Sequence, residues 1–288
     1  MAPRFLAIDW GTTNRRVFLI EGGTVIASDW SPRGAAVVED FAAEVASIRE
    51  ELGDQPMLLA GMVGSTIGWK SVAYVAAPAG LAELSAAVEW IDARTAIVPG
   101  ISWRDGLRAD VMRGEEVQLL GAVVAGLVPG DALLCQPGTH CKWAWLENGR
   151  IERFVTAMTG ELFALLRQHS LLAAQLGSTV EAGNAFRAGV SEGARGDLTA
   201  SLFAIRASGL LGLRSDTDAA SYASGLLIGA DFAQRLPEVP AGPVYILSDP
   251  ALGLLYATAI ETLGQTSTLI DSHAAFVAGI GRIWEMLQ

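Results

Sequence analysis

Short apolar runs alternate with amphipathic stretches along most of the chain. Where apolar residues recur three or four positions apart, as at Phe41, Val45 and Ile48, the spacing predicts a helix, and short runs of β-branched and other apolar residues predict strands. The strands predicted in this way cover residues 5–8, 16–20, 24–28, 57–60, 96–98, 132–135, 142–146, 150–155 and 244–247. The predicted helices cover residues 37–52, 81–91, 115–127, 160–169, 219–235, 252–263 and 273–287. Because strands and helices interleave, we expect an α/β fold.

One supersecondary unit is used twice. In each copy a strand leads into a Gly-Thr turn, a second strand follows, and a Glu-x-Gly turn leads into a third strand. The Gly-Thr pairs are Gly11-Thr12 and Gly138-Thr139, and the Glu-x-Gly turns begin at Glu21 and Glu147. The repeat predicts two homologous domains, each with its own sheet and helices.

The domain boundary is expected in the stretch Asp105–Arg113, between the two copies of the repeat. This stretch has no Ser/Gly-rich composition, so it indicates a hinge rather than a flexible tether. The predicted domains are residues 1–108 and 109–288. The last helix, residues 272–288, could pack back on the N-terminal domain.

Composition and charge exclude several classes of protein. Hydrophobic residues make up 51% of the 288-residue chain, enough for large cores, so an intrinsically disordered protein is excluded. The chain has 20 Lys and Arg against 31 Asp and Glu, and no basic run beyond Arg15-Arg16, so we expect no nucleic-acid partner. No apolar run approaches the roughly 18 residues of a membrane span, and the N-terminus lacks a signal-peptide pattern. We therefore expect a cytoplasmic protein without a membrane partner.

The two Gly-Thr turns carry the first chemical signal. Glycine lets the backbone approach a ligand closely, neighbouring N–H groups can bind an anion, and the Thr hydroxyl adds a donor. Asp9, two residues before Gly11, is suited to holding Mg²⁺, usually through water, because this ion prefers one or two carboxylates together with phosphate oxygens. Both turns could instead be ordinary hairpin connections. Their occurrence twice in the same setting favours a site for the phosphates of a nucleotide.

Further sequence strings extend this signal over nearly the whole chain. The run Asp9–Asn14 resembles the first phosphate motif of the actin/hexokinase/heat-shock-protein ATPase superfamily. Together with that run, the chain is similar to the 2-dehydro-3-deoxygalactonokinase family through the strings AGMVGS (60–65), VMRGEE (111–116), PGTHCKW (137–143), MTGEL (158–162) and SGLLIGA (224–230). The resemblance implies duplicated actin-like (ribonuclease H-like) domains, each a mixed β-sheet with flanking helices, around a central cleft.

The resemblance also implies an ATP-dependent kinase that phosphorylates the 6-hydroxyl of 2-dehydro-3-deoxy-D-galactonate in galactonate catabolism, with Mg²⁺ organised by Asp9. This reaction needs a carboxylate that accepts the proton of the acceptor hydroxyl. Glu115 is the preferred base, because an acid of a Gly-Asp-Gln string has this place in related carbohydrate kinases. Glu116 and then Glu161 are the alternatives. Glu115 and Glu116 could also be no more than first-turn acids of a helix.

The other expected site residues form two sets. Phosphate or nucleotide contacts are expected from Gly11, Thr12, Thr13, Asn14, Gly138, Thr139, His140, Lys142 and Ser248. Sugar-acid contacts are expected from Met62, Val63, Gly64, Ser65, Trp69, Arg113 and Glu161. Arg113 suits a carboxylate through bidentate pairing, although a surface arginine is nearly as good an interpretation. The residues from 62 to 69 could equally be a glycine-rich connection followed by a core tryptophan.

Several points stay open at the level of sequence. A kinase for a related sugar or sugar acid, such as 2-dehydro-3-deoxy-D-gluconate, would show the same motifs. A nucleotide-gated binding protein without acceptor chemistry could have the same fold. The run Ser248-Asp249-Pro250 replaces the superfamily's glycine-rich adenosine turn, so the nucleoside base is open. The C4 epimer of the sugar acid and the oligomeric state are open as well.

Overall fold

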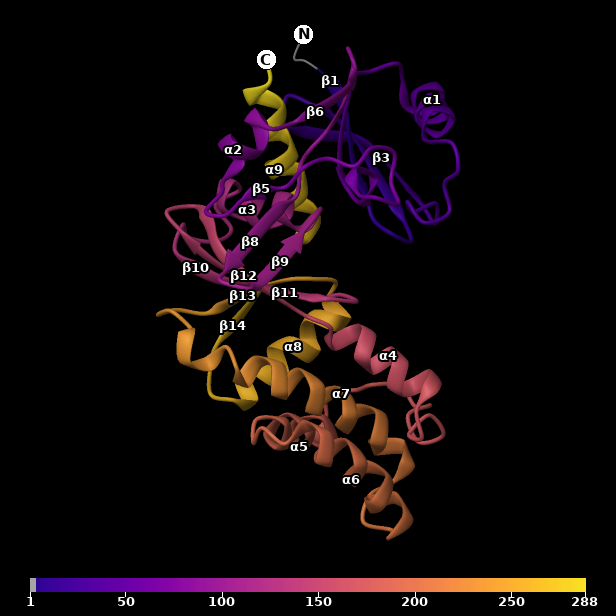
Figure 1. Cartoon of the computed structure of the whole chain (residues 1–288), viewed down its shortest axis with the longest axis vertical. Helices are drawn as coiled ribbons and strands as arrows, with labels where there is room; N and C mark the ends of the chain where they lie inside the picture. Colours follow the sequence, from indigo (N-terminus) through magenta and orange to yellow (C-terminus); the bar gives the residue numbers. More distant parts are fainter. Residues whose placement is uncertain (1–3) are drawn as a thin grey trace. The chain divides into compact units, whose positions relative to one another are not determined.

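The computed structural model describes residues 4–288 of the chain (Figure 1). The chain divides into two compact units. Unit 1 contains the residues up to Asp131 together with 144–154 and 271–288, and unit 2 contains 132–143 and 155–270. Each unit combines strands and helices, which confirms the expected α/β class. The start of the chain, where the sequence predicts no signal peptide, includes residues 1–3, which lie outside the described residues.

Unit 1 is built on a mixed sheet. Its strands are β1 (Arg4–Trp10), β2 (Arg15–Glu21), β3 (Thr24–Ser31), β4 (Met57–Gly61), β6 (Glu89–Asp92) and β7 (Thr95–Ile97). They follow the order β3-β2-β1-β4-β7-β6. β2 runs antiparallel to both β1 and β3, whereas β1, β4 and β7 run parallel to one another. β1 and β4 are central and almost entirely buried, which explains their nearly continuous apolar sequences.

The other elements of unit 1 are helices and a small second sheet. They are α1 (Phe41–Leu52), η1 (Met62–Gly64), α2 (Leu81–Ala86), α3 (Glu115–Val124), α9 (Ser272–Met286), β5 (Val75–Ala76), β8 (Ile101–Asp105) and β9 (Arg108–Met112). Helix α1 buries Phe41, Val45 and Ile48, the periodic positions that predict it, in a core shared with β1 and β4. Asp40 caps the first turn of α1 by accepting a hydrogen bond from the N–H of Ala43.

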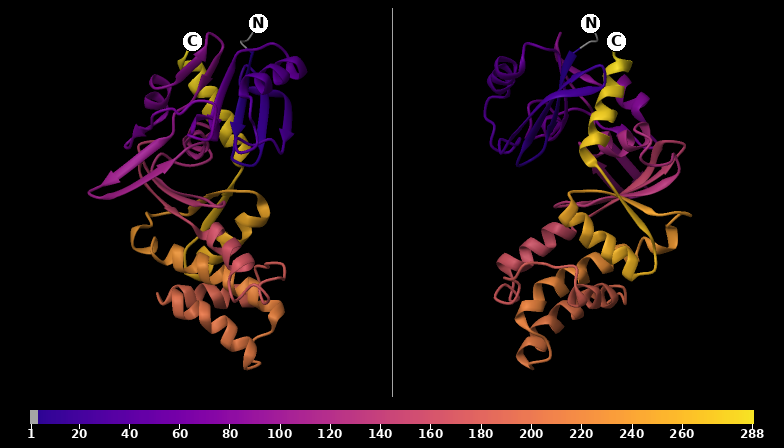
Figure 2. Two further views of the ribbon diagram at one scale, coloured as in Figure 1. Left: turned by 45° about the vertical axis from the view of Figure 1, so that its right-hand side comes forward. Right: turned by 180° about the vertical axis from the view of Figure 1, so that it is seen from behind.

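The C-terminal helix α9 belongs to unit 1, where it lies beside α3 (Figure 2). The two backbones approach closely at Gly121, because a Cβ at this position would lie 2.0 Å from the carbonyl oxygen of Ala275. Helix α9 also contacts β1, and the ring of Trp284 stacks on that of Phe5 with 4.7 Å between centroids. Only glycine at position 121 permits the close approach of α3 and α9.

The structure differs from the sequence predictions in several places within unit 1, and the strands β5, β8 and β9 are not among the predicted ones. The stretch Asp105–Arg113, interpreted as a hinge at a boundary after residue 108, contains the turn and second strand of a β8–β9 hairpin. Helix α3 remains in unit 1 because it packs on α9. The helix predicted over residues 81–91 ends at Ala86, because Glu89–Asp92 pairs antiparallel with β7 as an edge strand.

A five-stranded sheet repeats the start of the six-stranded sheet of unit 1. It is formed by β10 (Ala132–Gln136), β11 (Cys141–Glu147), β12 (Arg150–Ala157), β13 (Val244–Leu247) and β14 (Ser267–Ile270). The strand order is β12-β11-β10-β13-β14, and β10, β13 and β14 run parallel. The succession β10, β11, β12 corresponds to β1, β2, β3, so the predicted strand repeat is confirmed at the level of topology.

Unit 2 is rich in helices. They are α4 (Thr159–His169), α5 (Asn184–Gly193), α6 (Leu198–Leu210), α7 (Asp216–Ala233), η2 (Leu236–Glu238) and α8 (Pro250–Thr262). Helices α5 and α7 pack closely, since a Cβ on Gly189 would lie 2.1 Å from the carbonyl oxygen of Tyr222. The sequence did not predict α5, α6 or β14. Between residues 4 and 288, no helix combines the length and the apolar character that crossing a bilayer requires.

Candidate active site

The first Gly-Thr turn connects β1 to β2 in unit 1. The carbonyl oxygens of Gly11 and Thr12 accept hydrogen bonds from the N–H groups of Ala35 and Ala36, at 2.9 and 3.1 Å. Thr12 and Thr13 are exposed, and in the described part of the chain their N–H groups donate to no protein atom. The turn is therefore held through its carbonyl groups, while two of its N–H groups are available to a ligand.

The second Gly-Thr turn connects β10 to β11 in unit 2 and has the same construction. The carbonyl oxygen of Thr139 accepts a hydrogen bond of 2.9 Å from the N–H of Glu161, at the start of α4. A Cβ on Gly160 would lie 2.4 Å from the carbonyl oxygen of Gly138, so only glycine allows this approach. The N–H groups of Thr139 and His140 donate to no protein atom among residues 4–288. Each turn thus offers two N–H groups that could bind phosphate oxygens.

Asp9 lies near the end of β1, with 16% of its side chain exposed. One of its oxygens accepts a hydrogen bond of 3.3 Å from the amide of Gln118, and the guanidinium of Arg16 is 4.0 Å away. Burial raises the pKa of Asp9 to about 6, against the effect of Arg16, and the negative charge of Glu115 adds to the increase. Ionisation of Asp9 is therefore less favourable than that of an exposed aspartate. A cation beside the carboxylate would favour its ionised form.

Glu115 and Glu116 are the first residues of α3 and have different surroundings. Glu116 is fully buried, and its two carboxylate oxygens accept hydrogen bonds of 2.8 and 2.7 Å from the N–H of Gly114. Burial, and then the charge of Glu115, raise the pKa of Glu116 to about 8. Glu115 is only half-buried and accepts one hydrogen bond of 3.0 Å, from the N–H of Arg113. Of the two acids, Glu115 is the one that a ligand can reach and the one whose charge acts on Asp9.

The connection after β4 is a tight 3₁₀ turn. The hydroxyl of Ser65 donates a hydrogen bond of 2.7 Å to the carbonyl oxygen of Met62. Val63 and Gly64 are buried, whereas Met62, Ser65 and Trp69 are half-buried. Trp69 packs against the core of unit 1, and its ring stacks on that of Phe41 with 6.4 Å between centroids. These residues therefore shape one wall next to β4, and Trp69 is at least partly a core residue.

Arg113 precedes α3 and is not a surface arginine, because only 8% of the residue is exposed. Its Nη2 donates a hydrogen bond of 2.6 Å to the carbonyl oxygen of Val72, and its guanidinium stacks on Tyr74 at 4.3 Å from the ring centroid. Within the described residues, Nε and Nη1 are buried without a hydrogen-bond partner. A Cβ on Gly64 would lie 2.8 Å from Nη1. Nε and Nη1 of Arg113 therefore have hydrogen-bonding capacity that no group in the described residues uses.

The polar residues of unit 2 are less free than the sequence suggests. The His140 Nε2 and a Glu161 carboxylate oxygen are 2.5 Å apart, so the reserve candidate for the base is already paired. Lys142 is buried, and its Nζ donates a hydrogen bond of 2.7 Å to the hydroxyl of Thr156. Ser248 directly precedes the cap of α8, and its hydroxyl oxygen is buried with no partner among residues 4–288.

A pocket of about 180 Å³ opens beside the second turn, within unit 2. Its walls are mostly apolar and are formed by Gly138, Thr159, Gly160, Phe163, Val180, Ser224, Leu227, Ile228, Leu252, Leu255 and Tyr256. The sequence does not predict this pocket. Apolar positions on α4, α7 and α8 give the same periodic signal whether they face a core or a cavity. Mostly apolar pockets with a few polar groups are typical of small-ligand sites.

The residues from 9 to 283 match the model of one protein family, described as DGOK, 2-keto-3-deoxy-galactonokinase. The chain belongs to this family. The 2-dehydro-3-deoxygalactonokinase of Escherichia coli (strain K12) is 35% identical over 289 residues, which cover 98% of this chain and 98% of that protein. The resemblance inferred from the sequence strings is therefore confirmed.

Solved structures agree with this family membership. The crystal structure of a Sinorhizobium meliloti protein assigned as a 2-dehydro-3-deoxygalactonokinase superimposes with a TM-score of 0.92 at 34% identity, and the match covers 98% of this chain and 99% of the other. Component A of the (R)-2-hydroxyglutaryl-CoA dehydratase of Acidaminococcus fermentans matches with a TM-score of 0.55 at 13% identity over 99% of both chains. The second likeness concerns the fold alone, which a protein with another name shares.

Proposed function

We propose that this chain transfers the γ-phosphoryl group of ATP to the 6-hydroxyl of 2-dehydro-3-deoxy-D-galactonate, giving the 6-phosphate and ADP, in galactonate catabolism. The family match over residues 9–283 carries the proposal, because this span includes both turns, the acids at the start of α3 and the apolar pocket. The likeness to the Escherichia coli kinase over 98% of the chain supports the same substrate. We expect the reaction to take place in the cytoplasm.

The first turn binds phosphate oxygens through the N–H groups of Thr12 and Thr13 in this proposal. Gly11 and Asn14 close the turn, since a Cβ on Gly11 would lie 3.3 Å from the carbonyl oxygen of Asn14. The free N–H groups and the exposure of the two threonines support this role. Binding here depends on the backbone, so substitution of the threonine hydroxyls alone should have a smaller effect than displacement of the turn.

The second turn binds phosphate oxygens through the N–H groups of Thr139 and His140, with Gly138 at its start. Lys142, close after the turn in β11, adds positive charge near it. Its ammonium group is buried and donates a hydrogen bond to Thr156, so it does not extend into solvent. The adjoining pocket receives the nucleoside. Ser248 stays a predicted nucleotide contact, although it is not among the residues that line this pocket. Since the pocket is mostly apolar, we expect recognition of the base mainly by shape.

Asp9 holds Mg²⁺, largely through water, in this proposal. One carboxylate with water and phosphate oxygens is a donor set that Mg²⁺ prefers, and Asp9 supplies the carboxylate. When bound, the ion neutralises charge on the phosphates. With a pKa of about 6, Asp9 is mainly ionised above that pH and can attract the ion.

Glu115 accepts the proton of the 6-hydroxyl. Its partial exposure and its single backbone hydrogen bond support this role, whereas Glu116 is buried and bound by the N–H of Gly114 through both oxygens. Glu161 ranks third because it is paired with His140. A carboxylate that can accept a proton from the acceptor hydroxyl is what this phosphoryl transfer requires of the chain.

Arg113 binds the carboxylate of the sugar acid, and the support for this assignment is that Nε and Nη1 have no hydrogen-bond partner within residues 4–288. Met62, Ser65 and Trp69 supply the half-buried wall next to it, while Val63 and Gly64 act through the backbone. Gly64 leaves the space into which Nη1 extends. The carboxylate would give the guanidinium the hydrogen bonds that it lacks in the free chain.

An assay of ADP release with both epimeric 2-dehydro-3-deoxy acids tests the function. We expect Mg²⁺-dependent turnover with the galactonate-derived acid and a clearly lower kcat/KM with the gluconate-derived epimer. The reverse preference would support a kinase for the related sugar acid. Binding of ATP without turnover on either acid would support a nucleotide-gated binding protein.

A further inference from the structure

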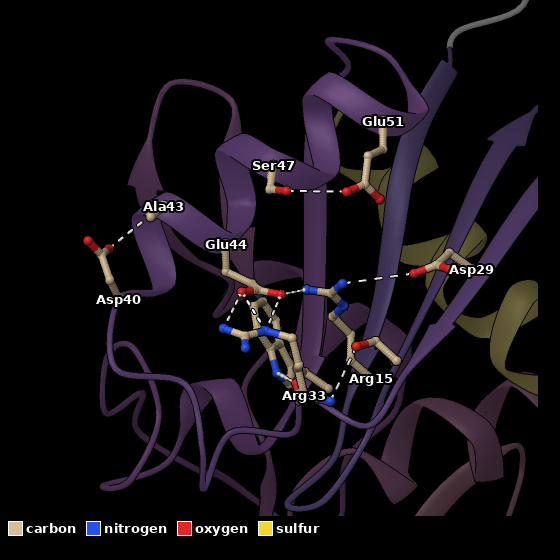
Figure 3. Close-up of polar contacts among 10 residues, drawn as sticks. Arg15, Asp29, Arg33, Asp40, Ala43, Glu44, Ser47 and Glu51 are labelled. Carbon is tan, nitrogen blue, oxygen red and sulfur yellow. Dashed lines mark hydrogen bonds and ion pairs between the residues drawn. The ribbon is translucent and has the colours of Figure 1, made fainter.

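Two arginines and one glutamate form a cluster behind the first turn, which we call the Glu44 cluster (Arg15, Arg33 and Glu44; Figure 3). Glu44 lies in the first turn of α1. Its Oε1 accepts hydrogen bonds from Nη1 of Arg15 and, at 3.0 Å, from Nε of Arg33. Its Oε2 accepts a hydrogen bond of 2.9 Å from the same Nε and lies 2.8 Å from Nη2 of Arg33. One carboxylate therefore binds two guanidinium groups, and Arg33 binds it in a bidentate way through Nε and Nη2.

The core of the cluster is removed from water. The side chains of Arg15 and Glu44 are 6% and 11% exposed, whereas that of Arg33 is 55% exposed. Arg15 is 5.5 Å from the ring centroid of Trp10, and a carboxylate oxygen of Asp29 is 3.9 Å from its Nη2. Burial tends to raise the pKa of Glu44, but the two arginines outweigh it and keep the pKa below its usual value. A buried ion pair is weak evidence for a contribution to stability. The role of the Glu44 cluster therefore has to follow from its position in the fold.

The cluster is attached to the first turn at both sides. Arg15 is the first residue of β2 and follows Asn14 directly. Arg33 is followed by the segment 34–36, which supports the turn from behind. A Cβ on Gly34 would lie 2.3 Å from the carbonyl oxygen of Thr12, so this segment and the turn are in close contact. The exit of the turn and its support are therefore bound to the same carboxylate.

The entry of the turn is fixed in the same way. The indole N–H of Trp10, the last residue of β1, donates a hydrogen bond of 3.1 Å to the carbonyl oxygen of Arg33. The residues before, behind and after the turn are thus connected through Arg33 and Arg15. Glu44 belongs to a different element, α1, which is anchored in the core by Phe41, Val45 and Ile48. The helix provides a rigid support for an otherwise local loop.

We propose that Glu44 is a positioning residue that holds the turn Gly11–Asn14 in its ATP-binding conformation through Arg15 and Arg33. It touches neither substrate in this role. The inference rests on the proposed function, in which the turn binds phosphates. Loss of the carboxylate lets Arg33 and the segment 34–36 move, and the N–H groups of Thr12 and Thr13 then lose their fixed direction. The second turn has no comparable dependence on Glu44, because its support is the start of α4.

Glu44→Gln is the decisive variant, because it keeps the shape of the side chain but removes the charge and one acceptor. Steady-state kinetics with ATP titrated at saturating sugar acid should show a KM for ATP raised about tenfold, a displacement of the turn by a fraction of an ångström being sufficient. The KM for the sugar acid should stay within about twofold. Arg33→Lys keeps the charge but not the fork, and it should give a smaller increase in the same constant. Since Arg33 is more than half exposed, this second variant is expected to fold.

Glu51→Gln is the matched control on the same helix. Glu51 accepts a hydrogen bond of 3.3 Å from the hydroxyl of Ser47 and lies outside the Glu44 cluster. The Glu51→Gln variant should therefore have the same KM for ATP as the wild type. An unchanged KM for ATP in Glu44→Gln and Arg33→Lys, with only a lower unfolding temperature, would overturn the proposal in favour of a structural ion pair. Equal increases in both KM values would overturn it as well.

Gly34→Ala separates this inference from the proposed function on which it rests. The added methyl group must displace the turn, so the KM for ATP should rise strongly if the turn binds phosphates. A strong effect in Gly34→Ala with none in Glu44→Gln would leave the phosphate role of the turn intact and refute the role of Glu44. No effect of Gly34→Ala would refute the phosphate role itself, and with it the positioning role.

Discussion

The two Gly-Thr turns share a backbone but differ in their surroundings. Each turn is supported through carbonyl oxygens by a second segment with a close-fitting glycine, Gly34 in unit 1 and Gly160 in unit 2. Around the first turn lie acids with raised pKa values and the Glu44 cluster. Beside the second turn lies a mostly apolar pocket. Repetition therefore accounts for the backbone construction, while the side chains around each copy have diverged.

This difference suggests a division of work. Asp9 can act on a metal ion, because the pKa of its carboxyl group is raised and a cation would favour its ionised form. Glu115 can act on a proton, because it is half exposed. In unit 2 the comparable acid Glu161 is paired with His140. Burial raises the pKa of Asp231 in unit 2 as well, but this carboxylate already accepts hydrogen bonds from Trp143 and Thr159. We infer that the first turn serves the chemistry and that the second serves the retention of the nucleotide.

The largest effect is expected from Asp9→Asn, which removes the carboxylate beside the first turn. We expect kcat to fall by at least about a thousandfold, because the amide cannot attract Mg²⁺ to the phosphates. Circular dichroism should show an unchanged fold. Asp54→Asn is the control, since Asp54 forms an exposed ion pair with Arg94 in the same unit. Normal turnover in Asp9→Asn would assign the metal to another residue and remove the contrast between the turns.

The next largest effect is expected from Glu115→Gln, which keeps the size of the side chain but cannot accept a proton at neutral pH. The kcat should fall by about 10²–10⁴-fold. The KM for ATP should change little, because in the proposed mechanism the turns and not this residue hold the phosphates. Stopped-flow or coupled measurements of ADP release give both constants. A large loss of kcat in Glu116→Gln with near-normal Glu115→Gln would transfer the role of base to Glu116.

Gly160→Ala tests the division of work from the side of unit 2. A Cβ here would lie 2.4 Å from the carbonyl oxygen of Gly138 and 3.0 Å from that of Thr139, so the second turn must shift. The KM for ATP should rise by about tenfold or more with a smaller change in kcat, in contrast to the two acid variants. Gly177→Ala is the control, because no atom lies within 4 Å of its added Cβ. A loss confined to kcat would mean that the second turn takes part in the chemistry.

The sequence predicted those parts of the fold that local residues determine. Gly11-Thr12 and Gly138-Thr139 mark their turns without help from distant residues, and the spacing of Phe41, Val45 and Ile48 marks α1. The sequence does not predict the hairpin β8–β9, because its residues are largely polar and exposed and Leu107 at its turn is fully exposed. Its strands are stabilised mainly by pairing with each other, which leaves little apolar pattern to recognise.

The candidate site could be predicted only as far as its motifs. Sequence alone cannot decide between Glu115 and Glu116, since the packing around α3, and not the residue type, buries one and leaves the other accessible. The Glu44 cluster joins residues from β2, a loop and α1, so no local pattern reveals it. Arg113 illustrates the same limit, because its burial depends on Val72, Tyr74 and other residues far from it in the chain.

The smallest effect concerns the pH dependence of stability near the first turn. The pKa of Glu116 is raised from its usual 4.5 to about 8, so between these values the folded chain holds a proton that the unfolded chain has lost. The stabilisation that this proton gives is complete below the unfolded pKa and is lost as the pH rises toward 8. Glu116→Gln cannot titrate, so its unfolding temperature should gain on that of the wild type by a few degrees between pH 5 and pH 8, measured by differential scanning calorimetry. Parallel curves for the two proteins would show that Glu116 is ionised in the folded chain, and the buried acid would then no longer distinguish the surroundings of the first turn.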